Sequence, residues 1–242
     1  MRVSRKRAGR WATYLFAFAC AGLARAGSVH AGDTSEFWPE IAGFWHLNDR
    51  SRIAVDAAYA LGKESDVKSL DAAAFWDVSL KPIARLRKDL LAEDWQRNKY
   101  LWARVGYHRI FEATDATGVE VVENRGVLAL YGRIPLPATF WLETRTRADF
   151  RWIGDDYSNR YRFRLDLSRE FTVRDHAVVP YGNVEWFYDT RYDDWARTLA
   201  TLGAEVTLTD HFRYELYLAR QADRVPQERN LNALGVVLKW YY

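Results

Sequence analysis

The feature that most constrains this chain is an alternation of apolar and polar residues with a period of two. Residues 139–153 place Phe140, Leu142, Phe150 and Trp152 on one face and Glu143, Arg145, Arg147, Asp149 and Arg151 on the other. Successive side chains of a strand point to opposite faces, so this period predicts strands rather than helices. The pattern recurs in residues 159–168, 177–188, 196–208 and 212–221. We therefore expect an all-β chain.

The spacing of these segments favours an antiparallel up-and-down transmembrane β-barrel. Short connections at 136–138, 173–176 and 209–210 are expected to face the periplasm, and the longer polar ones at 112–120, 154–158, 189–195 and 222–229 to face outside. With four earlier segments at 37–48, 51–61, 73–84 and 99–111, and seven from residue 122 onward, the sequence offers eleven strands. Bacterial single-chain barrels have an even number. We therefore expect twelve, with a further strand in 85–98, or else ten, without the first segment.

The first 31 residues have the composition of a secretory signal peptide. Five positive charges in the first ten residues precede an apolar core at 11–24, and small residues follow, so cleavage is expected after Ala26 or Ala31. That core is too short to span a bilayer as a helix, and we do not expect it to remain as an anchor. The barrel is then residues 32–242.

Charge and cysteine content exclude several classes of function. The chain has 35 Lys and Arg against 32 Asp and Glu, but six of the basic residues lie in the first 31 positions. The remaining 29 basic residues give no excess for binding nucleic acid. The one cysteine, Cys20, lies in the signal peptide, so disulfides and cysteine-ligated metals are not expected. The five histidines show no metal-ligand spacing, and we expect neither a metal nor a cofactor.

The last segment alternates and ends on an aromatic residue. Leu234, Val236, Leu238, Trp240 and Tyr242 share one face. This resembles the terminal signal by which outer-membrane barrels are recognised for assembly, with an apolar, lipid-facing edge and an interfacial aromatic at its foot. We expect the barrel-assembly machinery of a Gram-negative cell to recognise Leu238, Trp240 and Tyr242.

The chain also resembles a known family, domain of unknown function 2490. The resemblance rests on Asp94-Trp95-Gln96-Arg97 leading into residues 100–107, on Glu123-Asn124-Arg125-Gly126, and on residues 147–152, 181–189 and 232–235. It covers essentially the whole chain after the signal peptide. The resemblance implies an outer-membrane barrel of this size, and it implies no catalytic or ligand residues.

The rows of charge indicate which face of each strand meets lipid. An arginine facing lipid at the bilayer midplane costs about 2 to 4 kcal/mol, so these rows must point into the lumen. The expected charge ladder is Glu143, Arg145, Arg147, Arg162, Arg164, Glu185, Glu205 and Glu215. Its charges either neutralise one another, the favoured interpretation, or line a pore that selects solutes by charge. Most tryptophans are expected in belts at the two membrane interfaces, except Trp141, which shares the charged face.

Three functions are compatible with these observations. The favoured one is an outer-membrane barrel without enzymatic activity, either a narrow charged-lumen channel of porin type or a structural barrel with surface loops, in contact with outer-membrane lipid and of open oligomeric state. One alternative is a barrel enzyme that modifies lipid or lipopolysaccharide, with His108 as candidate base but no suitably placed serine. The other is a soluble periplasmic barrel that binds a small apolar ligand, with the alternation turned inside out.

Overall fold

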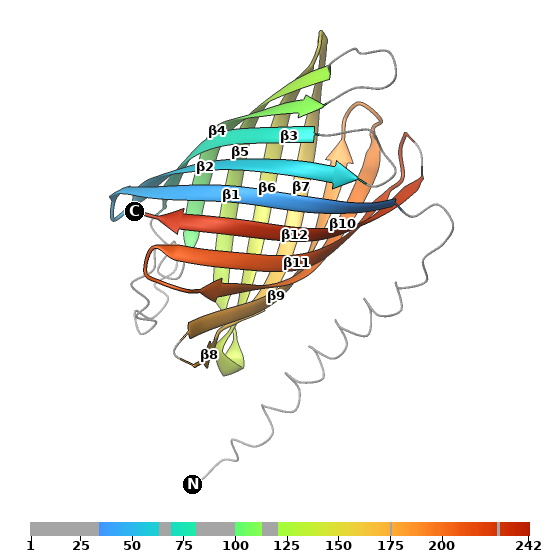
Figure 1. Ribbon diagram of the computed structural model, residues 1–242. Helices are drawn as coiled ribbons and strands as arrows, with labels where there is room; N and C mark the ends of the chain where they lie inside the picture. The colour runs from blue at the N-terminus through green and yellow to red at the C-terminus, as the bar shows by residue number, and fades with distance from the viewer. Residues whose placement is uncertain (1–33, 63–68, 81–99, 113–120, 175, 227) are drawn as a thin grey trace.

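The computed structural model describes residues 34–62, 69–80, 100–112, 121–174, 176–226 and 228–242, and the expected signal peptide lies outside these ranges. The strands are β1 (Thr34–Asn48), β2 (Ser51–Gly62), β3 (Ser69–Ser79), β4 (Leu101–Glu112), β5 (Val121–Pro135), β6 (Phe140–Ile153), β7 (Asp156–Arg169), β8 (Phe171–Val173), β9 (His176–Asp189), β10 (Asp194–Thr207), β11 (Phe212–Asp223) and β12 (Arg229–Tyr241). They curl into a barrel (Figure 1), which confirms the predicted all-β fold. One short 3-10 turn, η1 (Pro137–Thr139), precedes β6.

Eleven strands form the closed ring. Neighbouring strands from β1 through β7 pair in sequence order, and β7 then pairs with β9. The ring continues through β10, β11 and β12, and β12 pairs with β1 to close it. The twelfth strand, β8, pairs with β9 in the same register as β7, and it is therefore a continuation of β7 interrupted at Glu170. The eleven ring strands correspond to the eleven segments in the sequence. The further strand expected in 85–98 lies outside the described residues, and β3 pairs directly with β4, so the ring has no strand between them.

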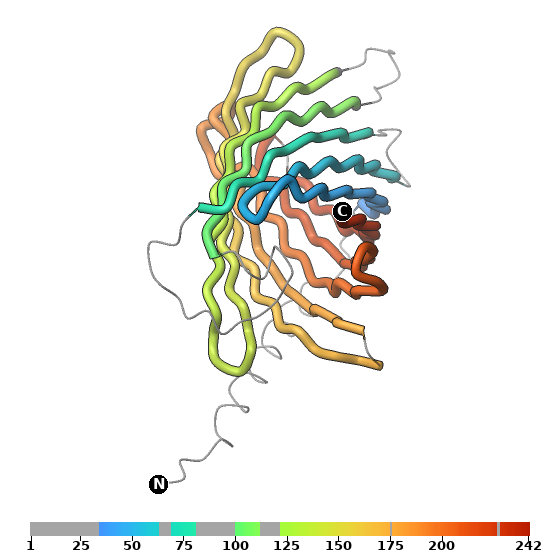
Figure 2. Tube along the Cα trace, turned by 90° about the vertical axis from the view of Figure 1, so that its left-hand side faces the viewer, coloured from blue at the N-terminus to red at the C-terminus, as the bar shows by residue number. Residues whose placement is uncertain are grey.

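An odd ring cannot be antiparallel throughout. The pair β1–β12 is parallel, with Thr34 beside Leu231 and Phe44 beside Tyr241, whereas every other pair is antiparallel. Figure 2 shows the two ends of the colour range, β1 in blue and β12 in red, side by side. The expectation of a wholly antiparallel barrel is therefore wrong at this one seam, because the sequence pattern fixes the faces of a strand but not its direction.

The connections follow the expected alternation only in part. The connection predicted at 154–158 is a two-residue turn, since β6 ends at Ile153 and β7 begins at Asp156. The longest interval between ring strands joins Ser79 of β3 to Leu101 of β4, at the end of the barrel where β12 finishes. That end therefore holds the longest connection and also the two-residue turn between β1 and β2, while the equally short turn between β6 and β7 lies at the opposite end.

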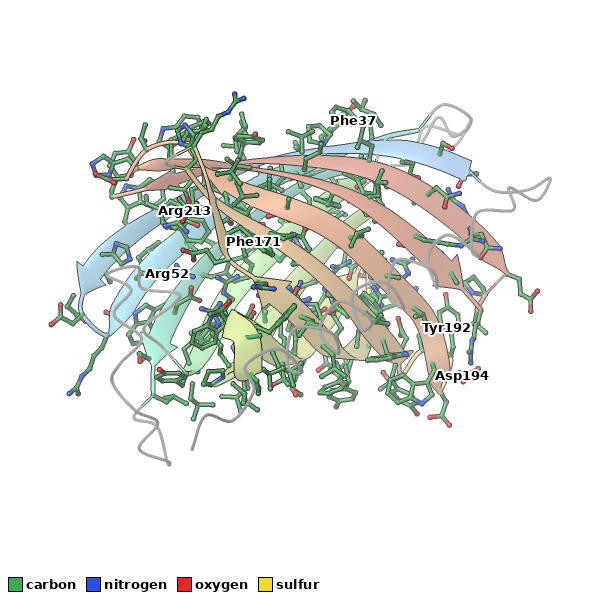
Figure 3. All side chains as sticks on the ribbon, turned by 90° about the horizontal axis from the view of Figure 1, so that it is seen from below. Phe37, Arg52, Phe171, Tyr192, Asp194 and Arg213 are labelled. Atoms are coloured by element: carbon green, nitrogen blue, oxygen red, sulfur yellow. The ribbon has the colours of Figure 1, made fainter. Side chains whose placement is uncertain are left out.

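Large apolar side chains cover the outside of the ring. Ile41, Leu128 and Leu218 are 58, 53 and 62% exposed, although each lies in the middle of a strand. The most deeply buried large side chains are charged instead, namely Arg52, Asp77, Asp149, Glu185 and Asp189. Figure 3 labels both kinds: Phe37 on the outside, and Arg52 and Arg213 in the interior. In the described part of the chain, no helix has the length and hydropathy needed to cross a bilayer.

Small residues make room for an aromatic side chain inside the barrel, near the parallel pair of strands β1 and β12. The ring of Tyr217 lies directly over Gly235 of β12, where any Cβ atom would overlap it. Ala42, Ala54 and Ala233 are likewise almost fully buried on neighbouring strands. Overpacking a close-packed interior is destabilising, so the small residues are what allows the aromatic side chain to fit.

Candidate functional site

The candidate site is a cavity of about 510 Å³ inside the ring, to which all eleven ring strands contribute. It is lined by every residue of the expected charge ladder: Glu143, Arg145, Arg147, Arg162, Arg164, Glu185, Glu205 and Glu215. The lining as a whole contains nearly equal numbers of acidic and basic side chains. Their arrangement within the cavity is uneven.

Four arginines gather on β6 and β7, and we call Arg145, Arg147, Arg162 and Arg164 the arginine wall. The antiparallel register sets Arg145 directly opposite Arg164, and Arg147 directly opposite Arg162. Like charges at directly opposite positions destabilise a sheet. The wall therefore requires anions close to it.

Two carboxylates supply part of that requirement. Glu185 on β9 accepts hydrogen bonds from Arg145 at 2.6 Å and from Arg162 at 2.8 Å. Asp149 on β6 accepts one from Arg147 at 2.5 Å and lies 3.7 Å from Arg162. A third carboxylate, Asp166 on β7, lines the same cavity and interacts electrostatically with Arg164. Four guanidinium groups thus face three carboxylates, and the wall keeps an excess of positive charge.

The excess leaves N–H groups without partners. Within the described part of the chain, Nε of Arg145 and Nη2 of Arg147 are buried and form no hydrogen bond. Arg164 forms neither a hydrogen bond nor an ion pair with any described residue, although it lines the cavity. An unpaired buried donor costs about 1 to 3 kcal/mol. The wall is therefore a site at which an added anion is favourable.

The remaining ladder residues are paired. Lys239 of β12 donates to Glu205 at 2.7 Å and to Glu215 at 2.5 Å, and Arg213 donates to Glu205 at 3.2 Å. Glu215 also accepts a hydrogen bond from the hydroxyl of Tyr181. This group neutralises itself, unlike the arginine wall.

Two further ion-pair groups were not among the expected residues. Asp77 on β3 joins Arg52 and Arg104 at 2.8 and 2.6 Å. Asp189, at the end of β9, accepts from Arg151 at 2.5 Å and from Arg160 at 2.8 Å. The signal for Asp77 was present, because it alternates with Phe75 and Ala73, but small residues on both faces of β3 hide the period.

An acidic pair lies across the lumen from the arginine wall. Glu40 on β1 and Asp56 on β2 line the same cavity, and neither forms an ion pair or hydrogen bond with a residue that the structure describes. Four ring strands separate β1 from β6 on one side and five on the other, so these two strands stand opposite each other. The sequence analysis missed both residues because their strands alternate weakly.

The tryptophans divide between the two faces. Trp45, Trp76, Trp152, Trp195 and Trp240 are exposed by 37 to 50%. Trp102 instead is 3% exposed, stacks on Tyr131 at 4.8 Å, and lines the cavity together with Trp38. The expectation of interfacial belts is wrong for these two, because both lie on the inward face of their strands. Trp95 lies outside the described residues.

The histidines in the described ranges form no constellation of the hydrolase kind. His108 contacts Asp71 through Nε2, and its Nδ1 is buried without a hydrogen-bond partner among the described residues. His46 and His211 contact the backbone oxygens of Tyr242 and Tyr241 at 3.2 and 2.8 Å. Within the described ranges, no group of histidines, cysteines and carboxylates is arranged to hold a metal ion.

The expected assembly residues lie on the outer surface beside the parallel seam. Trp240 packs against Phe212 at 4.7 Å, and Tyr242 is 61% exposed. The ring of Tyr242 stacks between Trp45, at 6.0 Å, and His211, at 6.2 Å. This residue therefore links β1 to the turn before β11.

Fold and site together define a closed β-barrel with an apolar outer surface and a charged lumen. The chain belongs to the family described as protein of unknown function DUF2490, whose model matches residues 36–232 and confirms the resemblance. No curated protein matches the sequence significantly. Among solved structures, the chain is similar to the β domain of the Bordetella autotransporter Brka, with 13% identity and a TM-score of 0.46 over 77% of this chain and 82% of that one.

Proposed function

We propose that this chain is an outer-membrane β-barrel whose lumen is a narrow passage for small charged solutes. The observation that carries the proposal is that apolar side chains lie on the outside and charged side chains in the interior, the reverse of a soluble protein. Leu128, Leu216 and Leu218 in mid-strand are at least half exposed, while the charged side chains of Arg52, Asp77 and Glu185 are among the most deeply buried. Exposed apolar surface on this scale is expected where lipid covers it. A soluble barrel that binds an apolar ligand requires the opposite arrangement.

The charged cavity supports the passage. Its volume of about 510 Å³ lies in the range of small-molecule sites. The unpaired arginines of one wall favour anions over cations during entry. The proposal includes no catalytic step, since Nε2 of His108 contacts Asp71 and its Nδ1 has no hydrogen-bond partner among the described residues. Outer-membrane lipid and the barrel-assembly machinery are the proposed partners.

The test has two parts, localisation and conductance. The chain should fractionate with outer membranes and migrate differently on gels with and without heating. In a planar bilayer, the purified barrel should give small channels that prefer anions. Replacing Arg164 by Gln should lower that preference, whereas Arg197→Gln, which makes the same charge change outside the cavity lining, should leave it unchanged. A folded barrel that never conducts would contradict the passage.

A further inference from the structure

Within the described ranges, arginine N–H groups without partners lie on one side of the lumen and the unpaired carboxylates of Glu40 and Asp56 on the other, and from this we propose that the lumen binds small zwitterionic solutes. The solute's carboxylate or phosphate lies on the arginine wall, and its ammonium group lies on the acidic pair, Glu40 and Asp56. This inference deepens the proposed function, on which it rests for its access to solute, because it names the class of solute.

The arginine wall provides the anion-binding half. Arg145 and Arg147 are 9 and 8% exposed, line the cavity, and each retain one buried N–H group without a partner among the described residues. Arg164 stands beside them with its whole guanidinium group unpaired in the described part of the chain. Guanidinium groups bind carboxylate and phosphate oxygens through short, charge-assisted hydrogen bonds. An oxyanion on this wall completes the hydrogen bonds that Glu185 and Asp149 leave open.

The acidic pair provides the second half. Glu40 and Asp56 line the same cavity on β1 and β2, opposite β6 and β7 in the ring. No cationic side chain within the described ranges neutralises either of them by an ion pair. An ammonium group carries three donors and no acceptor, so it is the complement of two carboxylates. The intervening cavity of about 510 Å³ accommodates a solute that reaches from one wall toward the other.

The two walls together discriminate among solutes. A simple anion is attracted by the arginine wall but is repelled by Glu40 and Asp56 across the lumen. A simple cation is attracted by Glu40 and Asp56 but is repelled by the arginine wall. A zwitterion in one orientation is attracted by both. Charge that is misplaced in a site is an effective means of rejecting the wrong ligand.

The test measures binding to the folded barrel in detergent micelles by NMR titration. Glycylglycine is the zwitterionic probe, and succinate is the anionic one. Arg164→Gln should weaken binding of both probes, by roughly tenfold for the loss of one charge-assisted contact. Asp56→Asn should weaken glycylglycine but strengthen succinate, and this opposite response is what a zwitterion site predicts. Glu40→Gln repeats the second test in case one variant fails to fold.

Matched controls lie at the mouth of the barrel. Arg197 and Asp223 form an ion pair at 2.5 Å and line no part of the cavity, so Arg197→Gln and Asp223→Asn change the charge equally without altering binding. Succinate binding more tightly than glycylglycine, with no loss of glycylglycine in Asp56→Asn and Glu40→Gln, would overturn the proposal. So would the absence of binding to a folded barrel that conducts ions. Binding to a barrel that does not conduct would contradict the passage alone.

Discussion

The arginine wall and the small-residue wall fill the same barrel by different means. On β6 and β7, the inward side chains are long and charged, and Glu185 and Asp149 hold them in place. The second region spans β11, β12, β1 and β2, and its inward positions include Ala42, Ala54, Ala219, Ala233 and Gly235, which we call the small-residue wall. There the ring of Tyr217 occupies the space that the small residues leave.

The difference explains where the lumen can take a solute. On the small-residue wall, the aromatic ring of Tyr217 fills the space beside Gly235 by close packing. On the arginine wall, one buried N–H group of Arg145 and one of Arg147 have no partner among the described residues, so a bound anion would complete their hydrogen bonds. We therefore expect substitutions to act through lipid contact and sterics in most of the ring, and through ligand binding at the arginine wall and at the acidic pair, Glu40 and Asp56.

The largest expected effect comes from placing a charge on the outer face of β7, compared with removing one from its inner face. Leu165→Arg places an unpaired charge in hydrocarbon and should lower the free energy of unfolding in lipid vesicles by about 2 to 4 kcal/mol. Arg164→Leu removes a side chain that has no ion pair among the described residues, and should cost much less. Urea titration of the folded barrel in vesicles measures both. Equal losses for the two variants would contradict the assignment of faces.

The next effect tests the small-residue wall. Gly235→Ala puts a Cβ atom into the ring of Tyr217 and should destabilise the barrel by about 1 to 3 kcal/mol, the usual cost of overpacking. Gly182→Ala is the matched control, since its Cβ atom would meet Leu202 at 3.7 Å, an ordinary contact. The same vesicle titration applies. Tolerance of alanine at 235 would show that Tyr217 does not depend on the glycine.

A smaller effect is expected at the parallel seam between the two regions. Tyr242→Ala removes the ring stacked between Trp45 and His211, and should cost about 0.5 to 1.5 kcal/mol and reduce the fraction of barrel that assembles. Heat-modifiable migration after expression measures the assembled fraction. Tyr192→Ala, in the turn between β9 and β10, removes an exposed tyrosine at the other end and serves as the control. An equal loss of assembled barrel in the two variants would show that Tyr242 has no special role in assembly.

The two regions also differ in how far the sequence predicts them. The arginine wall was predictable residue by residue, because charged and apolar side chains alternate strictly in β6 and β7. The small-residue wall was not, since Ala54 or Gly235 gives no contrast with an apolar neighbour on the other face. For the same reason Asp56 and Asp77 were missed, although both are inward charges.

Strand direction and ligand chemistry were beyond the sequence for a different reason. The pattern fixed eleven segments and their faces, but a preference for even numbers replaced that count by twelve. The register, with Thr34 beside Leu231 at one end and Phe44 beside Tyr241 at the other, is what shows that the closing pair is parallel. The pairing of Glu185 with Arg145 and Arg162, which leaves Arg164 over, likewise depends on which strands become neighbours.

The central claim is that the arginines face a lumen while the apolar side chains face lipid. Residues 32–242 contain no cysteine, so a single cysteine can be placed at position 164 or at position 165. Each variant is folded into vesicles and exposed to a lipid-soluble thiol reagent and, separately, to a small water-soluble one. The structure predicts that 165 reacts from the bilayer and 164 only from water. Labelling of 164 from the bilayer, or of 165 only from water, would contradict the account.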